Sequence, residues 1–201
     1  MSSEIELLDE ENGRLIVHIA RQSLEKFILN NEYDSTDLPL LPSELQLFGA
    51  TFVTLTNHGR LRGCIGHTLA RNPLAEDVAQ NAVAAARDFR FTPVEETELD
   101  EIRLEVTVLT PFQNVSYQDF DDLLGKLRVD IDGVMLSLGH KRALLLPQVW
   151  KRLPDPTQFL EAIAQKAGIP YQELRASPPT VQVQLFQAQH FAEPGYLEPG
   201  N

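Results

Sequence analysis

The residues with the most evident chemical potential lie in one short segment, residues 61–66, which read Leu-Arg-Gly-Cys-Ile-Gly. The segment holds Cys64, the single cysteine of the chain. A thiolate is a nucleophile, and neighbouring positive charge makes it easier to form. Because alternate side chains of a strand share a face, we expect Arg60 and Arg62 beside Cys64. A free cysteine is commonly buried and packs as a small hydrophobe; a functional thiol is the alternative that this spacing also allows.

Gly63 and Gly66 are unusual in a strand, because glycine offers no side chain to pack there. Such glycines mark a bulge, a tight bend, or the close approach of another backbone or a ligand. We therefore predict that Gly63, Gly66, Arg60 and His67 contact a substrate. His67 follows Cys64 closely and could act as its base, or it could be a turn histidine without a role.

Glu105 is the third candidate for chemistry. Residues 102–108 alternate apolar and polar side chains, which predicts a half-buried strand with Glu105 on its polar face. If this strand pairs near Arg62, a charge-assisted hydrogen bond can join the two side chains. The pair would either hold the arginine at a cleft, with Glu105 as an orienting or acid/base group, or be a structural ion pair. We thus name Cys64, Arg62 and Glu105 as candidate catalytic residues.

The other reactive side chains do not gather into a recognisable site. The five histidines are scattered and form no tight cluster with Asp or Glu, so no metal site is predicted. The chain has no phosphate-binding glycine loop, dinucleotide motif or serine elbow, and we predict no cofactor. Asp88 and Arg90 follow an alanine-rich segment, where an exposed turn is expected.

The elements that position these residues begin with a helix over residues 9–31, for which Asp9 is the N-cap. Residues 33–42 read as a loop. A β-hairpin is predicted next, with strands at 50–56 and 60–65 and a turn at 57–59. A second helix is expected up to about residue 88, with Asn72 as its cap and Pro73 at its first position.

The second half of the chain also mixes strands and helices. Asp132-Gly133 is a strong hairpin signal between two short apolar runs. Residues 141–146 predict a further strand. Asp155 begins a helix in which Gln158 can complete a capping box, and Gly168 ends it after residue 167. Residues 181–185 alternate as a late strand.

Tight turns between strand pairs favour an α+β fold with a mixed, mainly antiparallel sheet and helices packed on it. The 43% hydrophobic content suffices for one sizeable core or two smaller abutting ones. We place a single domain at residues 1–192 and a flexible tail at residues 193–201, which are rich in Pro and Gly.

The net charge is −12, which disfavours nucleic acid and anionic membranes as partners. No apolar run approaches the roughly 20 residues of a membrane helix. The N-terminus lacks the basic start and apolar stretch of a signal peptide. We therefore expect a cytoplasmic protein with neither membrane nor nucleic-acid partners.

Residues 61–66 resemble the hallmark motif of the AMMECR-type domain family, and blocks at residues 49–55, 73–78, 104–109 and 144–149 are also similar to family blocks. The resemblance runs from about residue 5 to residue 192 and implies an α+β fold with two unequal subdomains sharing a cleft near the motif. Where family members often read Asp-Pro-Arg-Phe, this chain has residues 88–91 as Asp-Phe-Arg-Phe. At position 67 a small hydroxyl residue is common, whereas here it is His67.

The resemblance carries no established reaction. Bacterial and archaeal members resemble protein A of the AmmeMemoRadiSam system, which implies a Memo-like protein and a radical-SAM protein as companions. Two hypotheses stay open. In one, the chain is an enzyme or enzyme component that acts through Cys64 on a small anionic molecule. In the other, it is a non-catalytic adaptor module that docks onto a companion, and the motif is a structural turn.

Overall fold

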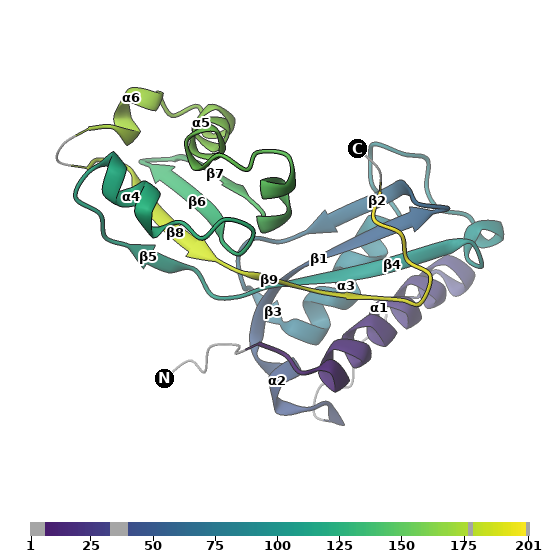
Figure 1. Cartoon of the computed structure of the whole chain (residues 1–201). Coiled ribbons are helices and arrows are strands. Elements are labelled where there is room, and N and C mark those ends of the chain that lie inside the picture. The colour runs from purple at the N-terminus through teal and green to yellow at the C-terminus, as the bar shows by residue number, and fades with distance from the viewer. Residues whose placement is uncertain (1–6, 33–39, 177–178, 200–201) are drawn as a thin grey trace. The chain divides into compact units, whose positions relative to one another are not determined.

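A computed structural model describes residues 7–32, 40–176 and 179–199 of the chain (Figure 1). The chain divides into two compact units, a larger one made of residues 1–110 and 189–201 and a smaller one made of residues 111–188. Each unit combines helices with a sheet of antiparallel strand pairs. The predicted α+β class is therefore confirmed.

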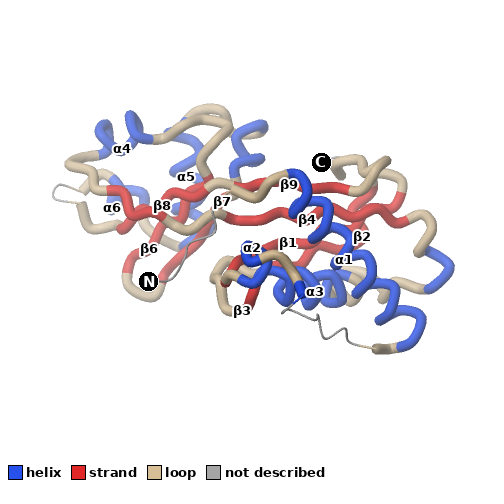
Figure 2. Tube along the Cα trace, turned by 90° about the horizontal axis from the view of Figure 1, so that it is seen from below, coloured by secondary structure: helices blue, strands red, loops and turns tan. Residues whose placement is uncertain are grey.

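The larger unit is built on a sheet in which four strands follow the order β2-β1-β4-β9 and β3 pairs with β1. Its strands are β1 (Phe48–Asn57), β2 (Arg60–Gly66), β3 (Asn72–Pro73), β4 (Ile102–Leu109) and β9 (Ala188–Ala192). Its helices are α1 (Glu10–Asn30), α2 (Ser43–Gln46) and α3 (Leu74–Ala85), with a short 3-10 helix at Glu96–Glu98. Figures 1 and 2 show α1 and α3 on one face of this sheet. That face carries the apolar core of the unit.

The β1–β2 hairpin forms as predicted. Asn57 pairs with Arg60, which leaves a two-residue turn of His58 and Gly59. Both turn residues have positive φ, 48° and 74°, a conformation that matches the twist of the two strands. The hairpin fixes the start of β2 and the pairing of Leu61 with Thr56.

The helix ends of this unit agree with the sequence only in part. The Asp9 side chain accepts a hydrogen bond from the Asn12 backbone and caps α1, as predicted. The predicted cap of α3 is wrong: Asn72 and Pro73 form β3, and α3 starts at Leu74 without a side-chain cap. The helix also ends at Ala85, before the predicted residue 88. Residues 33–39 of the predicted loop lie outside the described residues.

The smaller unit packs its helices on the sheet β5-β8-β6-β7. Its strands are β5 (Gln113–Val115), β6 (Gly133–Leu138), β7 (Lys141–Leu145) and β8 (Gln182–Phe186). Its helices are α4 (Phe120–Lys126), α5 (Pro156–Ala167) and α6 (Tyr171–Leu174), with a 3-10 helix at Pro147–Lys151. Asp155 caps α5 and Gly168 ends it with φ 68°, as predicted. The strands predicted at 141–146 and 181–185 are also present.

The predicted hairpin at Asp132-Gly133 is wrong. The Asp132 carboxylate is buried and accepts hydrogen bonds from the backbone and the guanidinium of Arg128. Gly133 starts β6, and a side chain there would lie 2.4 Å from the Phe186 ring. The two residues thus close a loop that precedes β6, and β6 forms its hairpin with β7 instead.

No described helix is both long and apolar enough to cross a membrane.

Candidate functional site

The face of the larger sheet opposite α1 and α3 carries a line of polar side chains, and we call it the polar face. In β1, Val53 and Leu55 are fully buried in the core that α1 and α3 cover. Thr54 lies between them and therefore points to the other face. Its register partners are Cys64 in β2 and Glu105 in β4. The strand pairing thus aligns Cys64, Thr54 and Glu105 across three strands.

Cys64 is half-buried, and its sulfur receives a hydrogen bond of 3.3 Å from the Thr54 hydroxyl. Burial raises the pKa of the Cys64 thiol. The Thr54 hydrogen bond and the charge of Arg90 lower the pKa, while Asp88 and Glu105 raise it further. The net direction is upward, so the thiol is protonated at neutral pH. Arg90 thus favours the thiolate, whereas Arg60 and Arg62, the arginines predicted to do so, are not among the groups that shift this pKa.

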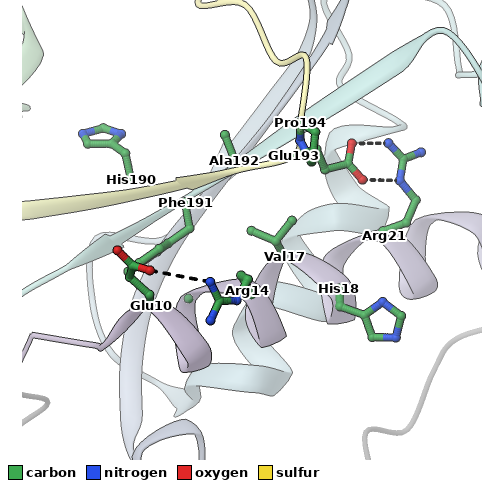
Figure 3. A pocket seen from close by; sticks show the side chains of 11 residues that line it. Glu10, Arg14, Val17, His18, Arg21, His190, Phe191, Ala192, Glu193 and Pro194 are labelled. Carbon is green, nitrogen blue, oxygen red and sulfur yellow. Dashed lines mark hydrogen bonds and ion pairs between the residues drawn. The ribbon is translucent and has the colours of Figure 1, made fainter.

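Glu105 contacts a histidine instead of the predicted Arg62. Its carboxylate accepts a hydrogen bond of 3.4 Å from the Thr107 hydroxyl and lies 3.3 Å from His190 Nδ1. The Glu105 side chain is 13% exposed, and that of His190 is 38% exposed. His190 comes from β9, and Figure 3 shows it pointing away from Phe191, which points toward α1. The polar line therefore extends over a fourth strand.

Arg62 binds the segment that follows α3. Its guanidinium forms a two-point ion pair with Glu98 at 2.7 and 2.8 Å and donates to the carbonyl oxygens of Thr92 and Pro93. The ion pair lowers the pKa of Glu98. The structure therefore gives Arg62 a structural role as a clamp on residues 92–98.

A β-bulge explains why the predicted arginine cluster does not form. The register runs from Leu55–Gly63 directly to Thr56–Leu61, so Arg62 has no partner in β1 and the alternation of faces breaks there. Arg60 pairs with Asn57, two places from the buried Leu55, and so lies on the α1/α3 side. The prediction that Arg60 and Arg62 share a face with Cys64 is therefore wrong.

Both glycines of the motif are required by packing. A Cβ atom at Gly63 would lie 2.1 Å from the carbonyl oxygen of Ala85 at the end of α3. One at Gly66 would lie 2.3 Å from the carbonyl oxygen of Thr51. The close backbone approach expected from the sequence is present at both positions. A substrate contact for either glycine stays a prediction.

Asp88 and Arg90 close the free edge of β2. The Cys64 backbone N–H donates to the Asp88 carboxylate at 2.9 Å, and Arg90 donates to the Cys64 carbonyl oxygen at 3.2 Å. Hydrogen bonds from Arg90 hold the pKa of Asp88 well below its usual range. The expected exposed Asp–Arg turn is wrong for Asp88, which is buried, whereas Phe89 and Arg90 are exposed.

His67 is directed toward α3. Its Nδ1 lies 2.6 Å from a carboxylate oxygen of Asp77, which is fully buried. The other oxygen of Asp77 accepts hydrogen bonds from Thr51 and Asn81. In the alternation of the strand, His67 follows Ile65 on the core side, whereas Cys64 is on the polar face. A base role for His67 toward Cys64 is therefore not supported.

The predicted flexible tail begins with an anchored residue. Arg21 of α1 forms a two-point ion pair with the Glu193 carboxylate (Figure 3). The Glu193 backbone N–H donates to the Leu104 carbonyl oxygen. Further along, Tyr196 is half-buried. Burial raises the pKa of Tyr196, and the charges of Glu105 and Cys64 raise it further. Tyr196 therefore lies near the polar line.

His190 and Tyr196 could not be found from the sequence, because neither belongs to a motif. Their place depends on how the last strand pairs with β4. Within the described ranges, no three or more His, Cys, Asp or Glu side chains are placed to hold a metal ion. A groove of about 460 Å³ lies between α1 and β9, with Val17, Phe191 and Pro194 among its lining residues (Figure 3).

Known proteins are similar to this chain over most of its length. Residues 17–191 match the AMMECR1 family model. A protein of Methanothermobacter thermautotrophicus is 37% identical over 195 residues, which cover 94% of this chain and 97% of that protein. A protein of Thermofilum pendens is 36% identical over 202 residues and is covered to 92%.

The structure is similar to the crystal structure of the uncharacterized protein PH0010 from Pyrococcus horikoshii. The TM-score is 0.76 at 31% sequence identity, with 94% of this chain and 93% of that chain covered. The extent of these matches shows that the chain belongs to the AMMECR1 family.

Proposed function

We propose that the chain is an enzyme, or a component of an enzyme system, that acts through the Cys64 thiol on the polar face. The alignment of Cys64, Thr54 and Glu105 across three strands is the observation that carries this proposal. A protonated thiol needs a base before it can attack, and Glu105 is the carboxylate of that line. Its contact with His190 sets the orientation of the carboxylate.

Proton transfer from Cys64 would pass through Thr54. Cys64 and Glu105 are two strand spacings apart, about 10 Å between their Cα atoms. The Thr54 hydroxyl lies between them and is hydrogen-bonded to sulfur. Thr54 donates this bond in the structure, so its hydroxyl would first have to turn, then accept the thiol proton and give its own proton to Glu105, its register partner in β4. The freed electron pair on sulfur would then add to a carbonyl carbon of the substrate, and the electrons of the C=O π bond would move to the carbonyl oxygen.

The charges around the thiol favour a neutral or positively charged substrate. The anionic substrate expected from the sequence relied on Arg60 and Arg62, which do not lie on this face. Arg90 is the cation that acts on Cys64, and it is paired with Asp88. Glu105 adds negative charge. Directly beside the thiol, the charges therefore disfavour a small anionic ligand.

Alkylation with iodoacetamide tests whether the thiol can react at all. The chain has one cysteine, so intact mass spectrometry counts modification of Cys64 alone. We expect slow modification at neutral pH and faster modification as the pH rises, because the pKa is raised. A folded protein that stays unmodified at about pH 10 contradicts the proposal.

An adaptor role is the second candidate, favoured by the structural duties of the motif. Gly63, Gly66 and Arg62 all have packing or clamping functions that explain their presence without a substrate. In that case the chain docks onto a Memo-like or radical-SAM companion, and a Cys64→Ala variant binds it and supports the full activity of the system. Loss of system activity with binding retained would instead support the thiol-dependent enzyme.

A further inference from the structure

The segment after β9 crosses the polar face, and we call residues 193–198 the C-terminal strap. A Cβ atom at Gly195 would lie 3.8 Å from the Arg103 side chain in β4. One at Gly59, in the β1–β2 turn, would lie 3.4 Å from Leu197. Figure 1 shows the yellow segment leaving β9 and turning back toward β2. The strap therefore runs from the β9 edge of the sheet to the opposite hairpin.

One end of the strap is fixed by Glu193. The Arg21–Glu193 pair is 15% and 14% exposed, and the same carboxylate accepts the Leu104 backbone N–H at 3.0 Å. Arg21 also donates to the Ile102 carbonyl oxygen. Gly195 follows with φ 81°, a conformation that glycine adopts without strain. The strap thus has an anchored start and a turn directly after it.

The course of the strap places Tyr196 next to the polar line. It sits between Gly195, beside Arg103, and Leu197, beside the hairpin turn. Arg103 is two residues before Glu105, so both side chains point to the polar face. The raised pKa of Tyr196, which the charges of Glu105 and Cys64 increase, agrees with this position. The phenol therefore stays protonated and can donate a hydrogen bond.

We infer that the C-terminal strap is a lid over the Cys64 site and that Tyr196 is the positioning residue that closes it. This inference rests on the proposed function for its biological meaning, whereas the covering of Cys64 by the strap can be tested by itself. A lid over a thiol excludes water from it. When the strap opens, Cys64 gains solvent and its pKa falls.

The test is the rate of Cys64 alkylation, measured over a range of pH in the full chain. We expect Tyr196→Ala to react about tenfold faster than the wild type at neutral pH, because one unit of pKa changes the thiolate fraction by that factor. The pH at which the alkylation rate is half its maximum should also be lower in this variant. Tyr196→Phe, which keeps the ring, should stay close to the wild type in rate. Tyr171→Ala in α6 of the smaller unit is the matched control and should not change the profile.

A second variant keeps the inference testable if Tyr196→Ala fails to fold. Gly195→Val strains the positive φ of the turn and displaces the strap without touching the site. It should also accelerate alkylation. Wild-type rates and midpoints in a folded Tyr196→Ala or Gly195→Val protein would overturn the lid. If the variants accelerate alkylation while Cys64→Ala keeps full system activity, the lid stands and the proposed enzyme function fails.

Discussion

At the scale of single residues, the motif divides into a part that holds the fold and a part that can react. Arg62, Gly63 and the backbone of Cys64 all fasten β2 to α3 and to the segment after it. Among the side chains of the motif that could react, that of Cys64 faces the polar line. A short, distinctive motif can therefore be retained mostly for packing while a single atom of it is available for chemistry.

Arg62 provides a direct test of this division. In an Arg62→Ala variant Glu98 and two carbonyl oxygens lose their donor, which should lower the free energy of unfolding by about 1–3 kcal/mol. Urea denaturation measures the change. Arg60→Ala, on the same strand, is the control and should have little effect. An unchanged stability in Arg62→Ala would argue that the clamp is unimportant.

Asp88 should make the free energy of unfolding depend on pH in the acid range. Its pKa is held low in the folded protein by Arg90 and by the Cys64 backbone. In the unfolded chain the pKa of an aspartate is about 3.9. Asp88 therefore contributes fully to the free energy of unfolding above this pH, and the contribution is lost as the pH falls through the lower pKa of the folded protein. Asp88→Asn should be less stable than the wild type at neutral pH, and the difference should shrink below about pH 4. A constant difference across this range of pH would contradict the assignment.

At the scale of elements, the contact between β2 and α3 depends on the absence of a side chain at Gly63. Gly63→Ala places a methyl group 2.1 Å from a backbone oxygen, which cannot swing away as a side chain can. We expect a loss of about 3 kcal/mol or more in unfolding free energy. Gly125→Ala in α4 is the control: nothing lies within 4 Å of its added Cβ, so it should be neutral or stabilising. Equal effects at both positions would rule out the steric explanation.

The sequence predicts most local elements of this fold because their signals are local. The hairpin turn at His58-Gly59, the Asp9 cap and the Gly168 helix end depend on residues a few places apart. Asp132-Gly133 misleads because the turn lies before it, over residues 128–132, where the buried Asp132 carboxylate accepts hydrogen bonds from Arg128. The site is less predictable. One bulge redirects Arg62, and the strand order β2-β1-β4-β9 brings together residues that are distant in sequence.

At the scale of the whole molecule, two apolar cores sit in two units, and the polar line belongs to the larger one. The single tryptophan, Trp150, is buried in the core of the smaller unit and stacks on Phe159. Its fluorescence therefore reports the smaller unit, whereas protection of Cys64 from alkylation reports the larger one. The two probes allow each core to be followed separately.

A substitution of Leu160 tests the apolar core of the smaller unit. It is fully buried, and Leu160→Ala should cost about 2–5 kcal/mol through lost contacts and a cavity. The Trp150 fluorescence transition in urea should move to lower concentration. The exposed Leu197→Ala, in the larger unit, is the control and should leave that transition in place. No shift for Leu160→Ala would contradict the core assigned to this unit.

The most direct test of the proposed site, in which Thr54 and Glu105 act on Cys64, is the pH midpoint of Cys64 alkylation in two matched variants. Glu105→Gln removes a charge that raises the thiol pKa, so its midpoint should move to lower pH. Thr54→Val removes the hydrogen bond that lowers this pKa, so its midpoint should move to higher pH. Opposite shifts in the two folded variants are the predicted result. Wild-type midpoints in both would show that Thr54 and Glu105 do not act on Cys64, and would contradict the proposed site.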